Sequence, residues 1–208
     1  MSWAATLDSV EATARIGPNT IHQTLEAMRV LHGRASEMAL IKACRLEGFQ
    51  LSDGMVAEAD FEALVETLRS RLGFAEAAQV LRTAGDWTGA YVARHRIPSL
   101  ARAALARLPD LVALPMLLEA IRLHAWTFTG RGRFSRRNRP LELILEDHPC
   151  CRGEGPAFGG DYYAAAFQRL LRLVRSDLVV REVRCRRVHG GMACVFEVRP
   201  HDLLEKPS

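Results

Sequence analysis

Hydrophobic periodicity predicts helices over the first two thirds of the chain. Apolar residues recur there at intervals of three and four positions, the spacing of one helix face. Gly33, Gly73 and Pro98 stand where a helix is expected to end. Residues 110–126 are the most hydrophobic of these segments, so we expect that helix to be central. The predicted helices cover residues 19–33, 36–48, 58–73, 74–97 and 110–126.

Two glycines interrupt the predicted helix 74–97, in the stretch AGDWTG. A glycine inside a helix costs up to about 1 kcal/mol relative to alanine. The pair, Gly85 and Gly89, therefore predicts either a kink or the close approach of another element.

The pattern changes to β-type after His124. Alternating, β-branched or aromatic positions predict strands at 125–134 and 141–147, joined by a loop, RGRFSRRNRP, with five arginines. A helix over 161–174 and two strands joined by a glycine turn follow. The expected fold class is α+β: N-terminal helices plus a small antiparallel sheet with packed helices. The expected parts are helical 1–119, α/β 120–199 and a loose tail 200–208.

Composition is typical of a globular domain. The chain has 208 residues, 49% of them hydrophobic, enough to fill a core. No apolar run is long enough to span a bilayer, and the N-terminus has no signal-peptide pattern, so we expect a cytoplasmic protein. The formal net charge is +4, and only two of the 28 basic residues are lysines. We read no nucleic-acid partner into this arginine bias.

Five cysteines raise the question of metal binding. In a reducing cytosol they are expected to be thiols or metal ligands rather than disulfides. Glu182, Cys185 and Cys194 form an E-x2-C-x8-C pattern across the last predicted hairpin. A four-residue loop would pair Arg187 with Met192 and place Cys185 opposite Cys194, with Cβ atoms about 4.5–5.5 Å apart. A two-residue Gly-Gly turn would break that pairing.

Glu182 is harder to place in a shared site. On a regular strand it points away from Cys185, so a common metal requires a bulge or an irregular strand start. Structural zinc also takes four ligands. The fourth-ligand candidates are His148, Cys150, Cys151 and His189. The alternative is that both hairpin cysteines are small buried hydrophobes and that Glu182 pairs with an arginine.

Several blocks resemble the bacteriochlorophyll 4-vinyl reductase family over residues 15–199. They are RIGPN, ARHRIP, AIRLHAWTFTGRGRF, HPCCRG and DYYAAAFQRLLRLV. The resemblance implies a 4-vinyl-reductase domain from about residue 120, related in fold to Bet3-like proteins, which often dimerise around a hydrophobic ligand. It thus implies a possible homodimer here.

The same resemblance implies a zinc site. In sensor relatives zinc is held by a Cys, a Glu-x2-Cys and a final Cys, and Glu182, Cys185 and Cys194 match the last three. Gly160 stands in the region where the first cysteine is usual, and Cys151 or Cys150 is the expected substitute, with Cys151 taken as the ligand.

The family name implies reduction of a vinyl group on a chlorophyllide precursor, with NADPH or a separate electron donor. The sequence has no G-x-G-x-x-G turn between strand and helix and no iron–sulfur cysteine array. The resemblance therefore supports the pathway better than the reaction. Three functions stay open: a carrier or auxiliary factor for a porphyrin, Mg-porphyrin or chlorophyllide intermediate, a vinyl reductase, and a ligand-sensing scaffold.

A tetrapyrrole ligand needs aromatic faces, an axial ligand and cations for its carboxylates. Seven candidates fit these needs: three lie at helical spacing, two lie at the helix-to-strand junction and two lie in the arginine loop. The alternative for the helical and junction candidates is ordinary core packing, and the alternative for the arginines is a solvated surface. Magnesium chelatase or methyltransferase subunits are the expected protein partners. The candidates are Trp87, Tyr91, His95, His124, Trp126, Arg131 and Arg133.

Overall fold

The computed structural model describes residues 14–51, 54–151, 160–188 and 191–201. The helices are α2 (Asn19–His32), α3 (Arg34–Ala43), α4 (Glu58–His95), α5 (Ser99–Leu105), α6 (Asp110–Leu123), α7 (Trp126–Thr129), the 3-10 helix η2 (Pro149–Cys151) and α8 (Gly160–Leu171). The strands are β1 (Arg15–Ile16), β2 (Val56–Ala57), β3 (Arg133–Asn138), β4 (Leu141–Glu146), β5 (Leu178–Val188) and β6 (Gly191–Pro200). The α+β class is thereby confirmed.

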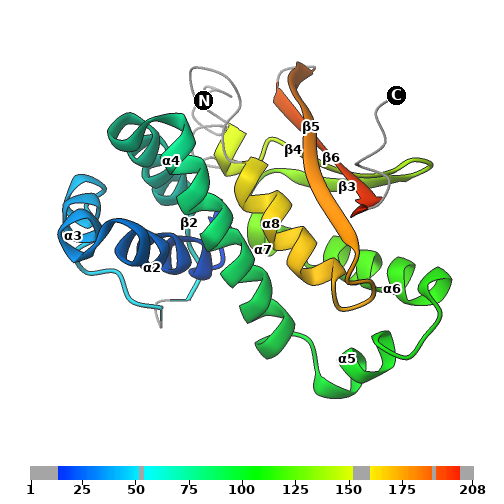
Figure 1. Cartoon of the computed structure of the whole chain (residues 1–208). Coiled ribbons are helices and arrows are strands. Elements are labelled where there is room, and N and C mark those ends of the chain that lie inside the picture. The colour runs from blue at the N-terminus through cyan, green and yellow to red at the C-terminus, as the bar shows by residue number, and fades with distance from the viewer. Residues whose placement is uncertain (1–13, 52–53, 152–159, 189–190, 202–208) are drawn as a thin grey trace, which may run out of the picture.

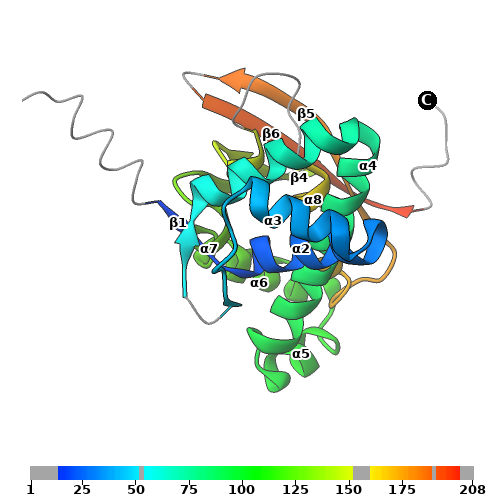
Figure 2. The same cartoon turned by 90° about the vertical axis from the view of Figure 1, so that its left-hand side faces the viewer.

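A four-stranded antiparallel sheet and helix α8 organise the C-terminal part. The strand order is β3-β4-β6-β5, so β6 returns beside β4 after the β5–β6 hairpin. Helix α8 packs on β5 and, on its other side, against the long helix α4 (Figure 1). Helices α2 and α3 contact α4 in turn (Figures 1 and 2). Helix α8 is therefore the element that joins the helical layer to the sheet.

The two glycines of α4 allow α8 to approach its backbone. A Cβ at Gly85 would overlap the backbone carbonyl of Tyr162, and one at Gly89 would overlap Ala166 and Arg169. Of the two predicted outcomes, close approach is confirmed. The contact is completed by the Tyr162 hydroxyl, 3.0 Å from the Thr88 hydroxyl.

The predicted helix boundaries are partly confirmed. Helix α2 ends at Gly33, which has a φ of 85°. Gly73 breaks the helical backbone with a φ of 77°, so α4 is two helical segments joined end to end. Helix α3 ends at Ala43, earlier than predicted, because Arg45 takes a positive φ. The short helix α5 was not predicted.

The expectation that residues 110–126 form the central helix is wrong. Helix α6 buries one face, yet Leu111 is 90% exposed and Met116 is 53% exposed. Apolar composition predicted burial all round, whereas only half of the helix surface meets the core. The central helices are α4 and α8.

The predicted strand at 125–134 and the arginine loop after it are also wrong. Residues 126–129 form the short helix α7, and the arginine-rich segment is itself strand β3. Arg133 to Asn138 pair with β4 residue by residue, and this pairing satisfies the backbone of a segment whose side chains are mostly polar. Among the described helices, none is long and apolar enough to cross a membrane.

Candidate functional site

The β5–β6 hairpin has the register that the four-residue loop predicts. Cys185 lies opposite Cys194, and Arg187 lies opposite Met192. The register shifts between Glu182 and Arg184, which leaves Val183 as an extra residue in β5. This bulge lets Glu182 and Cys185 reach the same side of the sheet. The irregular strand that a shared site requires is therefore present.

Five possible metal donors gather around Cys194. The side-chain donors of Glu182, Cys185 and Cys194 lie within 4.8 Å of one another, and so do those of His148, Cys151 and Cys194. His148 and Cys194 are fully buried, and Cys151 is 4% exposed. Three of the four residues predicted as metal ligands, Glu182, Cys185 and Cys194, therefore form one group, and Cys151 belongs to the other group through Cys194. We call the five residues the Cys194 cluster.

His148 is the cluster member that the predicted ligand set left out. It lies just before η2, whose turn lets the thiol of Cys151 approach the His148 carbonyl at 3.2 Å. Its ring packs edge-on against Tyr163, with centroids 4.6 Å apart. The sequence signal was the HPCC stretch itself, which supplies an imidazole and two thiols within four residues. His189, another sequence candidate, lies outside the described residues.

Glu182 is an electrostatically costly member of this cluster. Its Oε1 atom is buried and has no hydrogen-bond partner among the described residues. Burial, with a smaller contribution from the charge of Asp161, raises the pKa of the Glu182 carboxyl to about 7. A cation beside the carboxylate would offset that cost.

Gly160 lies directly against the Glu182 carboxylate. A Cβ at this position would overlap Oε2 of Glu182. Gly160, which the resemblance placed in the region of the expected first cysteine, therefore borders the cluster. The carboxylate occupies the space that a side chain at 160 would need.

Cys185 and Cys194 form a disulfide in the structure, with Cα atoms 4.0 Å apart. The expectation of free thiols is therefore wrong for this pair, whereas a role as metal ligands stays a prediction. Directly opposed positions on antiparallel strands bring two sulfur atoms into bonding range. A disulfide offers no thiolate, so these two residues can hold zinc only in their reduced form. Reduced, the cluster offers sulfur, nitrogen and oxygen donors, the set that zinc prefers.

The first three tetrapyrrole candidates lie along the C-terminal turns of α4. Trp87 is half-buried and packs against the core, as the alternative of core packing requires. The rings of Tyr91 and His95 stack obliquely, with centroids 4.7 Å apart. Tyr91 is half-buried and His95 is exposed, so the ring pair lies at the surface of the molecule.

The junction candidates lie in helix α7 or next to it. His124 and Trp126 are both exposed, and Trp126 is 60% exposed. Arg131 forms an ion pair with the buried carboxylate of Glu58 at 3.4 Å, and its backbone N–H donates to the same carboxylate at 2.9 Å. Arg131 therefore compensates the buried negative charge of Glu58.

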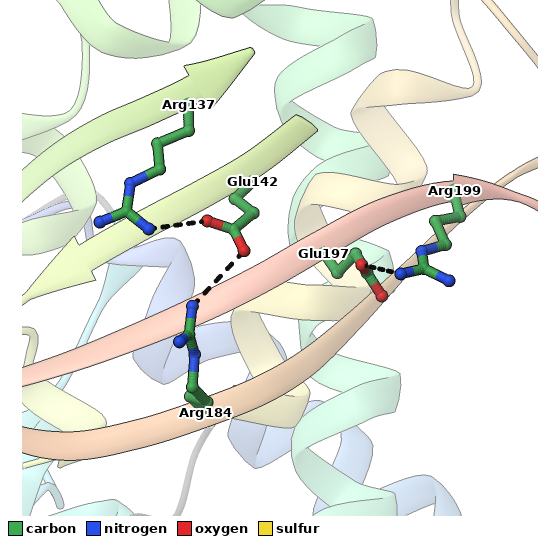
Figure 3. Close-up of polar contacts among 5 residues, drawn as sticks. All are labelled: Arg137, Glu142, Arg184, Glu197 and Arg199. Carbon is green, nitrogen blue, oxygen red and sulfur yellow. Dashed lines mark hydrogen bonds and ion pairs between the residues drawn. The ribbon is translucent and has the colours of Figure 1, made fainter. Parts of the chain in front are cut away.

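The remaining arginines of β3 mostly contact glutamates on the sheet. Arg133 pairs with Glu146 at 3.0 Å. Arg137 and Arg184 approach the buried Glu142 at 3.2 Å and 3.5 Å from two different strands (Figure 3). Arg199 and Glu197 form a further pair on β6 (Figure 3). The arginine-rich segment thus serves cross-strand ion pairing.

A shallow hollow of about 400 Å³ lies elsewhere, between β2 and the segment that follows α3. Its lining includes Arg45, Phe49 and Asp60 and none of the candidate residues. The structure therefore does not connect this hollow with the predicted tetrapyrrole residues.

Comparison with known proteins gives relatives by sequence and neighbours by fold. No family model matches the chain. The bacteriochlorophyll synthase 23 kDa chain of Rhodobacter capsulatus is 35% identical over 189 residues, covering 89% of this chain and 87% of the relative. The protein of the same name from Cereibacter sphaeroides is 34% identical over 189 residues, covering 89% of this chain and 91% of the relative. Neither name mentions a vinyl reductase.

Solved H-NOX domains share the fold. A structure from work on heme distortion in the H-NOX family superposes with a TM-score of 0.56, covering 93% of this chain and 97% of that domain. A variant of T. tengcongensis H-NOX gives a TM-score of 0.55, covering 92% and 99% respectively. Both are 11% identical, so this likeness concerns the fold alone. From its sequence relatives, the chain belongs to the family of the bacteriochlorophyll synthase 23 kDa chain.

Proposed function

We propose that this protein binds a porphyrin or Mg-porphyrin intermediate of bacteriochlorophyll biosynthesis and supplies it to enzymes of that pathway. The observation that carries the proposal is the match, over most of the chain, to relatives named for bacteriochlorophyll synthesis. The fold adds support, because its H-NOX neighbours come from work on heme, which is also a tetrapyrrole.

The ring pair Tyr91–His95 is the part of the predicted ligand set that fits a pigment best. A Mg-porphyrin presents flat apolar faces and a metal that accepts an axial ligand. The exposed imidazole of His95 can provide that ligand, and Tyr91 can stack on the macrocycle. Arg133 can exchange its exposed partner Glu146 for a pigment carboxylate, since surface ion pairs are weak. Arg131 is less suited, because its movement toward a pigment would break its ion pair with the buried carboxylate of Glu58.

A titration with Mg-protoporphyrin and protoporphyrin IX tests this function. We expect saturable binding at micromolar concentration, with a Soret-band shift and quenched pigment fluorescence. His95→Ala should weaken binding of the magnesium form about tenfold, the equivalent of about 1.4 kcal/mol. The metal-free porphyrin should respond less. His201→Ala, which removes an exposed imidazole at the end of β6, is the matched control. The absence of saturable binding to either pigment would overturn the proposal.

We further propose that the reduced Cys194 cluster holds a structural zinc ion. Cys151, Glu182, Cys185 and Cys194 would be the ligands, with His148 as a competing donor. Zinc is redox-inert and would stabilise the fold here rather than react. It would tie η2 to the β5–β6 hairpin and compensate the buried Glu182 charge.

The resemblance to vinyl reductases supports a second candidate activity. Incubation with a divinyl protochlorophyllide and NADPH would show it as a monovinyl product. Magnesium chelatase or methyltransferase subunits remain the proposed acceptors of the pigment, and pull-down with the loaded protein tests them. Capture without any pigment would instead favour a sensing scaffold. The Bet3-like relationship and a homodimer also remain proposals.

A further inference from the structure

Helix α6 exposes an apolar half that no other described part of the chain covers. Ala113, Leu117, Leu118 and Ile121 form its buried face. At 100° per residue, the opposite half contains Leu111, Val112, Met116 and Leu123, which are 90%, 46%, 53% and 58% exposed. The charged side chains of this half, Glu119 and Arg122, form an ion pair with each other. A helix that is apolar on both faces is normally buried on both.

The exposed apolar positions extend beyond α6 onto its neighbours. Leu100, in the first turn of α5, is 84% exposed, and Trp126 follows α6. Helix α5 packs on α6 and lies at the lower end of the molecule in both views (Figures 1 and 2). The α5–α6 surface is defined here as Leu100, Leu111, Val112, Met116, Leu123 and Trp126.

The chain around this surface is cationic. Residues 87–109 contain four arginines and neither aspartate nor glutamate. Arg102 is used internally, because its guanidinium donates to the carbonyls of Ala93, Arg94 and Ile97. The other three arginines, Arg94, Arg96 and Arg107, are exposed.

The nearby carboxylates do not cancel this charge. Asp110 pairs with Arg175 at 3.4 Å, and Glu119 pairs with Arg122. Arg175 is shared with Asp177, and within the described part of the chain no ion pair engages the three exposed arginines beside the α5–α6 surface.

We propose that the α5–α6 surface docks on an anionic phospholipid bilayer. Protruding aliphatic side chains can enter the acyl boundary, exposed arginines can meet lipid phosphates, and an exposed tryptophan suits the interface. A second copy of the chain fits less well, because a twofold contact would bring the same arginines against each other. An acidic protein partner fits less well too, because Leu100 and Leu111 are 84% and 90% exposed, whereas the side chains that dominate protein–protein binding usually sit in well-packed pockets.

Vesicle co-sedimentation of the full chain, without pigment, tests the proposal. We expect binding to vesicles of equal phosphatidylcholine and phosphatidylglycerol, and at least tenfold weaker binding to phosphatidylcholine alone. Leu111→Asp should reduce binding to the anionic vesicles at least tenfold. Each of Arg94→Gln, Arg96→Gln and Arg107→Gln should reduce it by about fivefold, in line with about 1 kcal/mol per basic residue near such a surface.

Two control variants on α3 test whether the loss of vesicle binding is specific to the α5–α6 surface. Met38→Asp introduces the same charge at a 53% exposed apolar position on α3, and Arg34→Gln removes an exposed arginine beside it. Neither should change vesicle binding, and circular dichroism should show that every variant is folded.

Four outcomes would overturn the proposal. They are failure of the wild-type chain to bind anionic vesicles, equal losses in the control variants, a dimer in solution that Leu111→Asp abolishes, and loss of porphyrin binding by Leu111→Asp without vesicles. In the last case the surface would be the pigment site. Because the vesicle assay contains no pigment, its failure and the failure of pigment binding are distinguishable.

Discussion

The Cys194 cluster and the α5–α6 surface depart from ordinary burial in opposite directions. The cluster buries ionisable donors, including the Glu182 carboxyl, whose pKa is raised to about 7. The surface exposes leucines, two of them by more than four fifths. Both arrangements cost free energy in the isolated chain, the first through desolvation and the second through apolar hydration. A partner can offset each cost, a cation in the first case and an apolar phase in the second.

The largest effect is expected from removing the donor that both halves of the cluster share. In reduced protein, Cys194→Ser should lower zinc affinity more than about 100-fold, since even second-shell changes commonly cost 10–100-fold. Competition with a chromogenic chelator measures this. Cys44→Ser is the control, because Cys44 lies outside the cluster. If both variants bind zinc like the wild type, Cys194 is not a ligand.

Crowding the cluster should have the next largest effect. Gly160→Ala places a Cβ against the Glu182 carboxylate and should lower the free energy of unfolding by about 1–3 kcal/mol. In a Glu182→Ala background the same change should cost less than about 0.5 kcal/mol. Urea titration measures both. Gly48→Ala, where no atom lies within 4 Å of the new Cβ, is the control. Equal costs in the two backgrounds would contradict the contact.

The cluster should also give the protein a distinctive pH dependence. The folded-state pKa of Glu182 lies above the ordinary carboxyl value of 4.5, so the folded protein holds this proton more tightly than the unfolded chain. Glu182 therefore makes the folded state less favourable as pH rises from about 4.5 to about 7. After discounting for partial solvent exposure, we expect a loss of about 1–2 kcal/mol in chelator-treated protein.

Glu182→Gln isolates this contribution, because other groups titrate in the same range. Its free energy of unfolding should fall less than that of the wild type between pH 5 and pH 8, measured by urea titration. Glu146→Gln, on an exposed ion pair, should retain the wild-type slope. Zinc should reverse the wild-type trend, because the metal favours the deprotonated carboxylate. Identical slopes in wild type and Glu182→Gln would show that Glu182 ionises normally.

Substitutions on the α5–α6 surface should hardly change the free energy of unfolding. Leu111→Gln should change the free energy of unfolding by less than about 0.5 kcal/mol, since the side chain is 90% exposed. Leu117→Ala, on the buried face of the same helix, should cost about 2–4 kcal/mol. A large loss for Leu111→Gln in thermal or urea unfolding would mean that this leucine is covered in solution.

Sequence patterns predicted the elements whose signals are local. The period of apolar residues and Gly33 predicted α2, and the hairpin arithmetic gave two registers, of which the structure has the one that pairs Cys185 with Cys194. The glycine pair of α4 predicted either a kink or the close approach of another element, and the structure shows the close approach of α8. The pattern failed at β3, because polar side chains there conceal a strand whose backbone is satisfied by β4.

The sequence by itself therefore determined the α+β class and limited the hairpin to two registers, one of which pairs Cys185 with Cys194 as observed. Only the tertiary structure decided which half of α6 is buried, where the bulge at Val183 turns Glu182, and that His148 joins Cys151 beside Cys194. The physical reason is range. Periodicity and turn chemistry act over a few residues, whereas these arrangements depend on contacts between elements that lie far apart along the chain.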